Sequence, residues 1–309
     1  MSATASGRTV AITGATGFVG AETLDQLLLA GFAVRALTRR PQSARPGVEW
    51  ITGALDRPES LDELVMEADI LLHIAGVVNA PDRMGFKQGN GVGTANAIAA
   101  MERAGLRRLI HVSSLAAREC DLSGYCWSKS LAEDHVRASR LDWTIVRPPA
   151  VYGPRDTEFR ELLRVARLGV LPVPAAGRSS FIHVRDLARL LVALCGETGD
   201  VHAGALWEVD DGTAAGLSHP DLAAAFGRAL GRKVRAVPLP RPLLMGMAGL
   251  DALARGKRAK LTTDRVRYMC HPDWVADPSK KPPADFWRPE ISADYGLAEI
   301  AAEFRSNPR

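Results

Sequence analysis

Short apolar runs alternate with amphipathic stretches over the first half of the chain. The runs are apolar almost throughout, which is typical of strands buried on both faces of a parallel sheet, and the stretches between them repeat apolar residues at helical spacing. After a first strand that ends at Thr13, we expect strands at 32–37, 48–52, 69–74, 109–113 and 141–146, and helices at 18–30, 58–67 and 86–104. This alternation predicts an α/β fold with a Rossmann-type, doubly wound parallel sheet.

The first apolar run breaks into three glycines at three-residue spacing, Gly14, Gly17 and Gly20, and amphipathic sequence follows. In a dinucleotide-binding turn the first glycine permits the turn, the second lets a pyrophosphate approach the backbone, and the third lets helix and strand pack closely. The N–H groups that open the helix then face the phosphates. We expect cofactor contacts from Gly14, Thr16, Gly17, Phe18 and Val19. The alternative is a turn with packing glycines and no ligand.

Residues after the following strands bear on which nicotinamide cofactor binds. Thr38 is followed by Arg39 and Arg40 where a domain that selects NAD usually has an acidic residue. Arginines suit a 2′-phosphate, so NADP is favoured and NAD stays open; the alternative is that Arg39 stacks on adenine or faces solvent. Asp56 is placed to reach the adenine, and the small residues Ala75 and Gly76 let the backbone pass close to the cofactor.

The densest chemistry follows the strand at 109–113. Ser114 comes at its end, and Tyr125 and Lys129 lie four residues apart at the start of a helix, so they share one face. Hydride transfer to a carbonyl needs a proton donor, and we expect the ammonium of Lys129 to pull the pKa of the Tyr125 phenol towards neutrality. The Ser114 hydroxyl is placed to hydrogen-bond the same carbonyl oxygen. The alternative for Tyr125 and Lys129 is a surface pair.

The second half of the chain predicts a smaller C-terminal α/β lobe. We expect a helix at 187–195 with Asp186 as its N-cap, a strand at 204–209 that returns to the main sheet, and a proline-rich loop at 170–177 over the substrate. Residues 1–170 then form the dinucleotide-binding domain, and residues 171–203 and 210–309 form the substrate-binding lobe.

A helix predicted within 242–261 has a broad apolar face and a basic end that includes Arg255, Lys257, Arg258 and Lys260. Between Arg228 and Arg267, eleven Lys or Arg residues stand against two acidic ones, although the whole chain carries a net charge of only +4. This polarity suggests an anionic partner, either a membrane surface met by 242–260 or a phosphorylated substrate. The alternatives are a lid over an apolar substrate, core packing, or a solvated basic face.

Composition narrows the class of protein further. The chain has 309 residues, of which 47% are hydrophobic and 24% charged, as in ordinary globular proteins. No apolar run approaches the ~20 residues of a spanning helix and no signal peptide precedes Arg8, so we expect a cytoplasmic protein, at most peripheral to a membrane. Four cysteines form no CxxC, which argues against a metal site and a disulfide framework. We expect a small-molecule partner and no nucleic acid.

Taken together, the motifs resemble the extended short-chain dehydrogenase/reductase family, which includes NAD-dependent epimerases and dehydratases. The resemblance spans nearly the whole chain and rests on Thr13-Gly14-Ala15-Thr16-Gly17-Phe18-Val19-Gly20, Asn90-Gly91-Val92-Gly93-Thr94, Ser113-Ser114, Tyr125 to Lys129 with Glu133, Arg147-Pro148-Pro149-Ala150-Val151-Tyr152-Gly153-Pro154, and Phe181-Ile182-His183-Val184-Arg185-Asp186-Leu187. It implies that Tyr125 is the acid/base, that Lys129 clamps the ribose and tunes the phenol, and that Ser114 holds the carbonyl. It also implies that Pro148 lines the nicotinamide side, that Asn90 is structural, and that the protein is a homodimer.

Three departures from nucleotide-sugar enzymes of that family favour another substrate. Ser179 stands where an arginine commonly grips the diphosphate, 115–119 lacks the usual Val-Tyr-Gly, and Tyr125 follows Ser114 by only eleven residues. The chain therefore looks similar to the 3β-hydroxysteroid dehydrogenase-like and hopanoid-associated branch. The leading hypothesis is an NAD(P)-dependent oxidoreductase that interconverts a secondary alcohol and a ketone on a bulky, lipid- or steroid-like substrate. The alternatives are a nucleotide-sugar 4-epimerase or dehydratase and a non-catalytic NAD(P)-binding subunit.

Overall fold

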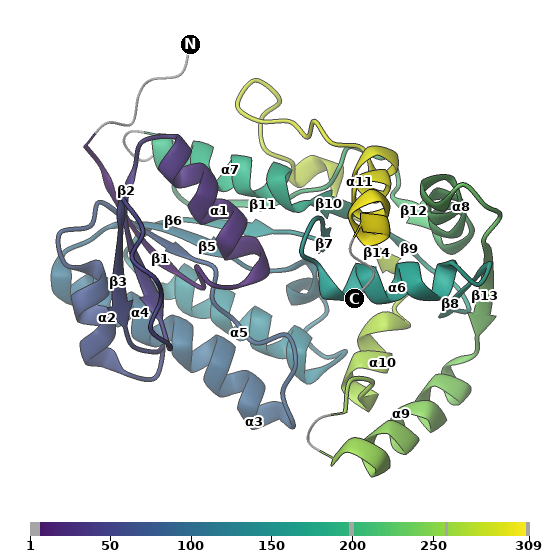
Figure 1. The fold of residues 1–309 in the computed structure, drawn as a ribbon. Coiled ribbons are helices and arrows are strands. Elements are labelled where there is room, and N and C mark those ends of the chain that lie inside the picture. Colours follow the sequence, from purple (N-terminus) through teal and green to yellow (C-terminus); the bar gives the residue numbers. More distant parts are fainter. Residues whose placement is uncertain (1–6, 198–200, 257–258, 307–309) are drawn as a thin grey trace.

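A seven-stranded sheet organises the fold, seen in a computed structural model that describes residues 7–197, 201–256 and 259–306 (Figure 1). The strand order is β11-β6-β5-β4-β1-β2-β3, and each pairing is parallel. The strands are β1 (Thr9–Thr13), β2 (Ala33–Thr38), β3 (Val48–Thr52), β4 (Ile70–His73), β5 (Arg108–Val112), β6 (Asp142–Arg147) and β11 (Ala205–Glu208). The predicted doubly wound sheet is confirmed. All strands end at one edge, here called the carboxyl edge, and begin at the opposite, amino edge.

Helices cover both faces of this sheet (Figure 1). On one face lie α1 (Phe18–Leu29) and α7 (Val184–Gly196), and on the other lie α2 (Pro58–Val65), α4 (Gly93–Ala104) and α5 (Gly124–Ala138). Leu27 and Leu190 pack in the first core layer, and Leu64 and Met101 pack in the second; all four are fully buried. Because burying each such side chain contributes roughly 1.5–3 kcal/mol, these two layers stabilise the main sheet.

The single helix predicted at 86–104 is three consecutive helical segments. Helix α3 (Arg83–Phe86) runs into a π-helical turn, η1 (Lys87–Val92), and then into α4. The buried Asn90 side chain bonds Val77 twice, accepting its N–H (2.7 Å) and donating to its carbonyl (3.0 Å). The same amide donates to the Ser128 hydroxyl (2.8 Å). Asn90 therefore has the structural role that the resemblance implies, because it joins the segment after β4 to α5.

The second half of the chain builds several small sheets beside the main one. The predicted loop at 170–177 is wrong over most of its length: Val170–Pro174 is strand β8, which pairs in parallel with β13 (Arg235–Leu239). Strand β10 (Phe181–His183) pairs with β7 (Ala150–Tyr152), and β9 (Arg178–Ser179) lies between β12 (Leu217–Ser218) and β14 (Asp273–Trp274). Helices α6 (Thr157–Ala166), α8 (His219–Leu230) and α11 (Ala293–Ser306) surround a third core layer.

Helix α7 begins at Val184, three residues before the start that was predicted. The prediction that Asp186 caps it is wrong, because the cap is His183, whose Nδ1 accepts the backbone N–H of Arg185 (3.3 Å). Asp186 is buried in the first turn and accepts the N–H groups of Glu290 and Ile291 (3.0 and 2.8 Å). It therefore fastens the C-terminal segment to the main sheet.

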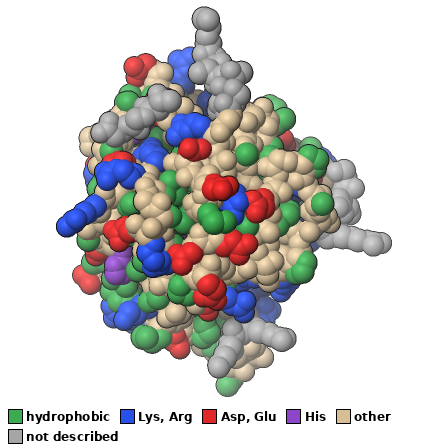
Figure 2. Space-filling model, turned by 90° about the vertical axis from the view of Figure 1, so that its left-hand side faces the viewer, with side chains coloured by type: hydrophobic (Ala, Val, Ile, Leu, Met, Phe, Trp, Pro, Cys, Tyr) green, Lys and Arg blue, Asp and Glu red, His purple; other side chains and the backbone are tan. Residues whose placement is uncertain are grey.

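Two further helices, α9 (Arg241–Arg255) and α10 (Thr263–Met269), pack on each other at the periphery (Figure 1). Within the described residues, no helix combines the length and hydrophobicity that crossing a bilayer requires. Lys257 and Arg258 of the predicted basic end lie outside the described residues. Figure 2 shows the side of the molecule that lies at the left in Figure 1, where hydrophobic side chains are interspersed with charged ones.

Candidate active site

The three glycines form a tight turn at the carboxyl edge. Gly14 has φ +79°, and a Cβ there would lie 2.8 Å from the backbone nitrogen of Ala75. A Cβ on Gly20 would lie 2.0 Å from the Gly14 carbonyl oxygen, so α1 packs on β1 only because Gly20 has no side chain. Gly17 is the N-cap of α1, and Thr16 and Gly17 are exposed. The free N–H groups at the start of α1, including those of Phe18 and Val19, form a site suited to a phosphate.

The predicted adenine-side residues lie at the same edge. Arg39 and Arg40 are exposed immediately after β2, and the Thr38 hydroxyl donates to the Arg40 carbonyl (2.7 Å). Asp56 is exposed between β3 and α2. Ala75 follows β4, and its N–H donates to the Thr13 hydroxyl (3.2 Å). Exposed basic and acidic side chains therefore lie at the carboxyl edge, and behind them the backbone after β4 runs close to the end of β1.

Ser114, Tyr125 and Lys129 meet where β5 gives way to α5. Ser114 caps the 3₁₀ helix η2 (Leu115–Arg118), where its hydroxyl accepts the Ala116 N–H (3.2 Å) and lies near the Tyr125 phenol. Lys129 is buried, and its Nζ donates to the Val112 carbonyl (3.1 Å). Burial lowers the pKa of Lys129 to about 8, although the nearby Glu133 carboxylate opposes that shift. That one bond uses one of the three ammonium protons.

We expected Lys129 to lower the pKa of the Tyr125 phenol towards neutrality. For the chain by itself this expectation is wrong. Burial raises the pKa of Tyr125 to about 12, and the Ser114 hydrogen bond lowers it only in part. The Tyr125 ring is enclosed by Phe86 and Tyr268, with ring centroids at 6.0 and 5.8 Å. Because these apolar neighbours disfavour a phenolate, Tyr125 keeps its proton at neutral pH.

Two further predicted cofactor residues lie beside these three. A Cβ on Gly76 would lie 2.9 Å from Asn90 Oδ1 and 3.9 Å from Lys129 Nζ, so the backbone at Gly76 borders the lysine. The Pro148 carbonyl accepts the N–H of Leu115 (3.0 Å), which joins the end of β6 to the Ser114 segment. The structure thus brings Gly76, Lys129, Ser114 and Pro148 to one part of the carboxyl edge.

Behind this edge lies a buried network of ion pairs centred on Glu133. Its carboxylate accepts from the Ser113 hydroxyl (2.5 Å), from Arg137 (2.5 Å) and twice from Arg147 (2.7 Å each). Arg147 also contacts Glu208 (3.3 Å), and both carboxylates are fully buried. Since Glu133 lies one turn after Lys129 on α5, the network fixes the rotation of the helix that carries Tyr125 and Lys129.

Three residues next to the candidate site were missed by the reasoning from sequence. The Asp264 carboxylate of α10 accepts the N–H groups of Gly124 (2.5 Å) and Tyr125 (3.4 Å), and so caps the start of α5. Tyr268 meets the Tyr125 ring edge-on, and Trp274 packs on Tyr268 with ring centroids 4.7 Å apart. These residues come from the C-terminal third, and only the tertiary fold brings them to Tyr125.

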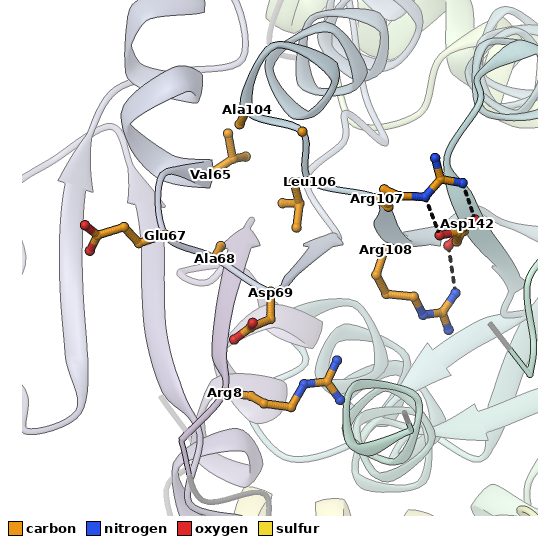
Figure 3. Close-up of a pocket in the computed structure, with 11 residues that line it drawn as sticks. Arg8, Val65, Glu67, Ala68, Asp69, Ala104, Leu106, Arg107, Arg108 and Asp142 are labelled. Atoms are coloured by element: carbon orange, nitrogen blue, oxygen red, sulfur yellow. Dashed lines mark hydrogen bonds and ion pairs between the residues drawn. The ribbon is translucent and has the colours of Figure 1, made fainter. Parts of the chain in front are cut away.

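A cavity of about 710 Å³ lies at the amino edge, on the side of the sheet opposite this site (Figure 3). Arg107, just before β5, and Arg108, the first residue of β5, face Asp142 there, and Arg8 lies below them (Figure 3). Arg107 makes a two-pronged bond to the Asp142 carboxylate (3.0 and 2.9 Å), and Arg8 donates to the carbonyls of Cys195 and Glu197. Ligands of open parallel sheets bind at the carboxyl ends of the strands, so we place the active site there.

Comparison with known proteins shows the family of the chain. Residues 14–197 match the model of a family described as NAD(P)H-binding. The chain belongs to this family. Its structural neighbours are extended short-chain dehydrogenases/reductases, so the resemblance seen in the sequence is confirmed and the nicotinamide cofactor with it.

Several relatives of this NAD(P)H-binding chain have assigned activities. It is 39% identical over 299 residues to the ceramide reductase of Caulobacter vibrioides, covering 94% of this chain and 91% of the relative. It is 30% identical over 220 residues to a ketoreductase of Stigmatella aurantiaca that acts on a farnesyl-dihydroquinoline oxide, covering 62% and 66%. The chain is thus an NAD(P)-dependent oxidoreductase of the short-chain dehydrogenase/reductase type.

Solved structures with bound cofactor share the fold. MoeE5 in complex with UDP-glucuronic acid and NAD superposes with a TM-score of 0.73 at 20% identity, covering 97% of this chain and 99% of that one. The UDP-glucuronic acid 4-epimerase of Bacillus cereus has a TM-score of 0.74 at 17% identity, with coverage of 96% and 99%.

Proposed function

We propose that this oxidoreductase uses NADP to interconvert a ketone and a secondary alcohol on a bulky, lipid- or steroid-like substrate. The observation that carries the proposal is that Ser114, the protonated Tyr125 phenol and the buried Lys129, one helical turn after Tyr125, lie together at the carboxyl edge. A phenol that keeps its proton at neutral pH suits the direction of reduction, in which it must donate that proton.

Each residue then has one task in the reaction. The nicotinamide, when bound, supplies the hydride in reduction and accepts it in oxidation. Tyr125 gives its phenolic proton to the carbonyl oxygen, and Ser114 donates a hydrogen bond to that same oxygen. Lys129 holds the ribose and favours the phenolate that reduction leaves, because its ammonium lies one turn away. The residues proposed to hold the cofactor are Gly14, Thr16, Gly17, Phe18, Val19, Arg39, Asp56, Ala75, Gly76, Lys129 and Pro148.

The substrate side of the site supports an apolar ligand. Tyr268 and Trp274 are aromatic, and they pack around Tyr125 with Leu115 and Leu122. The guanidinium of Arg178 donates to the carbonyls of Ala215 and Gly216 (2.7 and 2.9 Å), which occupies the arginine nearest to the position that grips a diphosphate. Two relatives are named for reducing a ceramide and a farnesyl compound. We propose that residues 171–203 and 210–309 form this lobe, and residues 1–170 with strand 204–209 the cofactor domain.

A nucleotide-sugar 4-epimerase or dehydratase is the second candidate, because the similar solved structures hold UDP-sugars. The two candidates separate in one assay. Purified protein is mixed with NADPH and a ceramide-type ketone, or with oxidised NAD or NADP and UDP-glucuronic acid. Net loss of NADPH with the lipid ketone supports the proposal. Interconversion of the UDP-sugar without net loss of cofactor contradicts it and supports the second candidate.

The preference for NADP rests on Arg39 and Arg40 at the end of β2. Among the described residues neither is in an ion pair with a carboxylate, so both guanidiniums are available to a 2′-phosphate. Arg39→Ala should weaken NADPH binding by about tenfold and leave NADH binding unchanged, since a partly exposed charge-assisted bond contributes about 1.5 kcal/mol. Equal loss for both cofactors in a binding titration would contradict the preference.

We also propose a homodimer, as in the family that the chain resembles, formed through two long helices of each subunit. Sedimentation of the purified protein tests it. A monomer at micromolar concentration would contradict this part of the proposal.

A further inference from the structure

Helix α9 presents an apolar face to solvent. Leu243, Met247, Leu250 and Leu253 are 51%, 43%, 68% and 86% exposed. The opposite face of α9 carries Leu244 and Ala248, which are buried against Val266 of α10. Helix α9 therefore packs on the rest of the protein through its buried face, and the exposed apolar side chains take no part in that packing.

The exposed residues form one continuous stripe. Leu243, Met247 and Leu250 follow each other at four- and three-residue steps, and Leu253 continues the same side, so they line up along the helix. The charged residues of α9 are Arg241, Asp251 and Arg255, and at ~3.6 residues per turn none of them falls within the stripe. Contiguous exposed apolar surface of this kind marks an interaction site rather than scattered surface residues.

The charge around the stripe indicates what covers it. Asp251 is neutralised locally, because it pairs with Arg255 (3.0 Å) and accepts the N–H groups of Lys260 and Leu261 (2.7 and 2.9 Å). Arg241 on α9 and Arg267 on α10 are exposed. The described residues of the α9–α10 hairpin, 241–256 and 259–269, carry five Lys or Arg against two Asp, and an apolar stripe on such a basic hairpin complements an anionic lipid surface. A second copy of the chain would instead bring two basic hairpins together along a ridge only ~22 Å long.

The same hairpin is connected to the catalytic helix. Helix α9 packs on α10, and α10 supplies both Asp264, which caps α5, and Tyr268, which meets the Tyr125 ring. The exposed leucines are therefore connected to the proposed proton donor, Tyr125, through the packing of α9 on α10 and the contact of Tyr268 with Tyr125.

We propose that α9 docks on an anionic bilayer, with Leu243, Met247, Leu250 and Leu253 entering the boundary between headgroups and acyl chains. Docking holds the aromatic side of the site, Tyr268 and Trp274, next to the lipid phase. The part that concerns substrate delivery rests on the proposed lipid-like substrate, whereas the docking itself does not.

Vesicle flotation tests the docking. The full-length protein is mixed with vesicles of phosphatidylglycerol and phosphatidylcholine, or of phosphatidylcholine alone. We expect binding to the anionic vesicles that weakens at ~1 M salt, because screening at that ionic strength shortens the reach of charges to ~3 Å. Leu250→Ser with Leu253→Ser should weaken that binding by at least ~tenfold, since each buried CH₂ contributes ~0.8 kcal/mol.

The matched control is Leu29→Ser with Met66→Ser, which removes exposed apolar side chains from the ends of α1 and α2. This control should bind vesicles like the unchanged protein. A second variant, Arg241→Gln with Arg267→Gln, should lose the preference for anionic vesicles while keeping the thermal midpoint. Equal binding by the α9 variant and the control, or no binding at all, would overturn the proposal. So would a change from dimer to monomer on serine substitution in α9, since the stripe would then be a contact between copies.

Turnover of a short, water-soluble ketone separates this proposal from the proposed function. Vesicle binding without any NADPH-dependent ketone reduction would support the docking and contradict the proposed function. Reduction of the soluble ketone without vesicle binding does the reverse. The α9 variant should reduce the soluble ketone at the unchanged rate.

Discussion

The two edges of the main sheet both bury basic side chains, yet they use them differently. At the amino edge, Arg108 donates to the Asp142 carbonyl and the Thr144 hydroxyl, and Arg107 pairs with the Asp142 carboxylate. These charges hold neighbouring strands together. At the carboxyl edge, Lys129 has a lowered pKa and borders the open backbone at Gly76. A basic side chain whose hydrogen bonds and ion pairs are all made within the protein has a structural role. A buried one that keeps unused hydrogen-bonding capacity beside a glycine is available to a ligand.

The largest expected effect is the loss of activity at the carboxyl edge. Tyr125→Phe removes the proton donor but keeps the ring that packs on Tyr268, so kcat should fall by about 10²–10⁴-fold while cofactor binding persists. Steady-state kinetics and a cofactor titration measure the two quantities. A variant as active as the parent protein would contradict the proposed role of Tyr125.

Next in size is the buried network behind that edge. Glu133→Gln leaves Arg147 without its paired carboxylate, so the free energy of unfolding should fall by about 3–5 kcal/mol. Urea denaturation measures it. The matched control is Glu49→Gln, because Glu49 is largely exposed in its pair with Arg35 and should cost about 0–1 kcal/mol. Similar losses for the two variants would mean that the network does not stabilise α5.

The third prediction concerns the pH dependence that Lys129 imposes. Burial lowers its pKa from 10.5 to about 8, so between these pH values the unfolded chain binds a proton that the folded chain does not. Stability must then rise with pH in this window. Relative to Lys129→Met, the free energy of unfolding should increase from pH 8 to pH 10.5 by on the order of 3 kcal/mol. A difference that stays constant across the window would show that Lys129 is solvated.

The smallest effect should come from the amino edge. Arg107→Gln breaks an ion pair in which the arginine is 66% exposed, so it should leave both the thermal midpoint and kcat nearly unchanged. Thermal unfolding and steady-state kinetics check both statements. Loss of activity here would mean that the cavity at this edge takes part in the reaction.

Much of the cofactor half could be predicted from the sequence because its signals are local. The turn at Gly14, Gly17 and Gly20 is defined by spacing within seven residues, and most strands of the main sheet are short, largely apolar runs. The sequence pattern does not, however, indicate that Val170–Pro174 is a strand. Its partner, β13, lies more than sixty residues later, and the prolines of β8 mimic a loop.

The substrate side was the least predictable part of the site. Asp264 and Tyr268 have no fixed spacing from Tyr125, so only the packing of α10 on α5 reveals them. The pKa of Tyr125 was predicted in the wrong direction for a related reason. Sequence spacing located the lysine that favours a phenolate, but it gave no measure of the apolar enclosure that opposes one.

The links from the catalytic region to the end of the chain have a consequence for synthesis on the ribosome. Arg118 donates to the carbonyls of Asp273 and Val275, and Glu208 accepts the N–H of Asp277. A nascent chain therefore completes its nucleotide-binding half early, since domains fold from the N-terminus during translation. The segment that carries Ser114 gains these last stabilising hydrogen bonds only after residue 277 has left the exit tunnel.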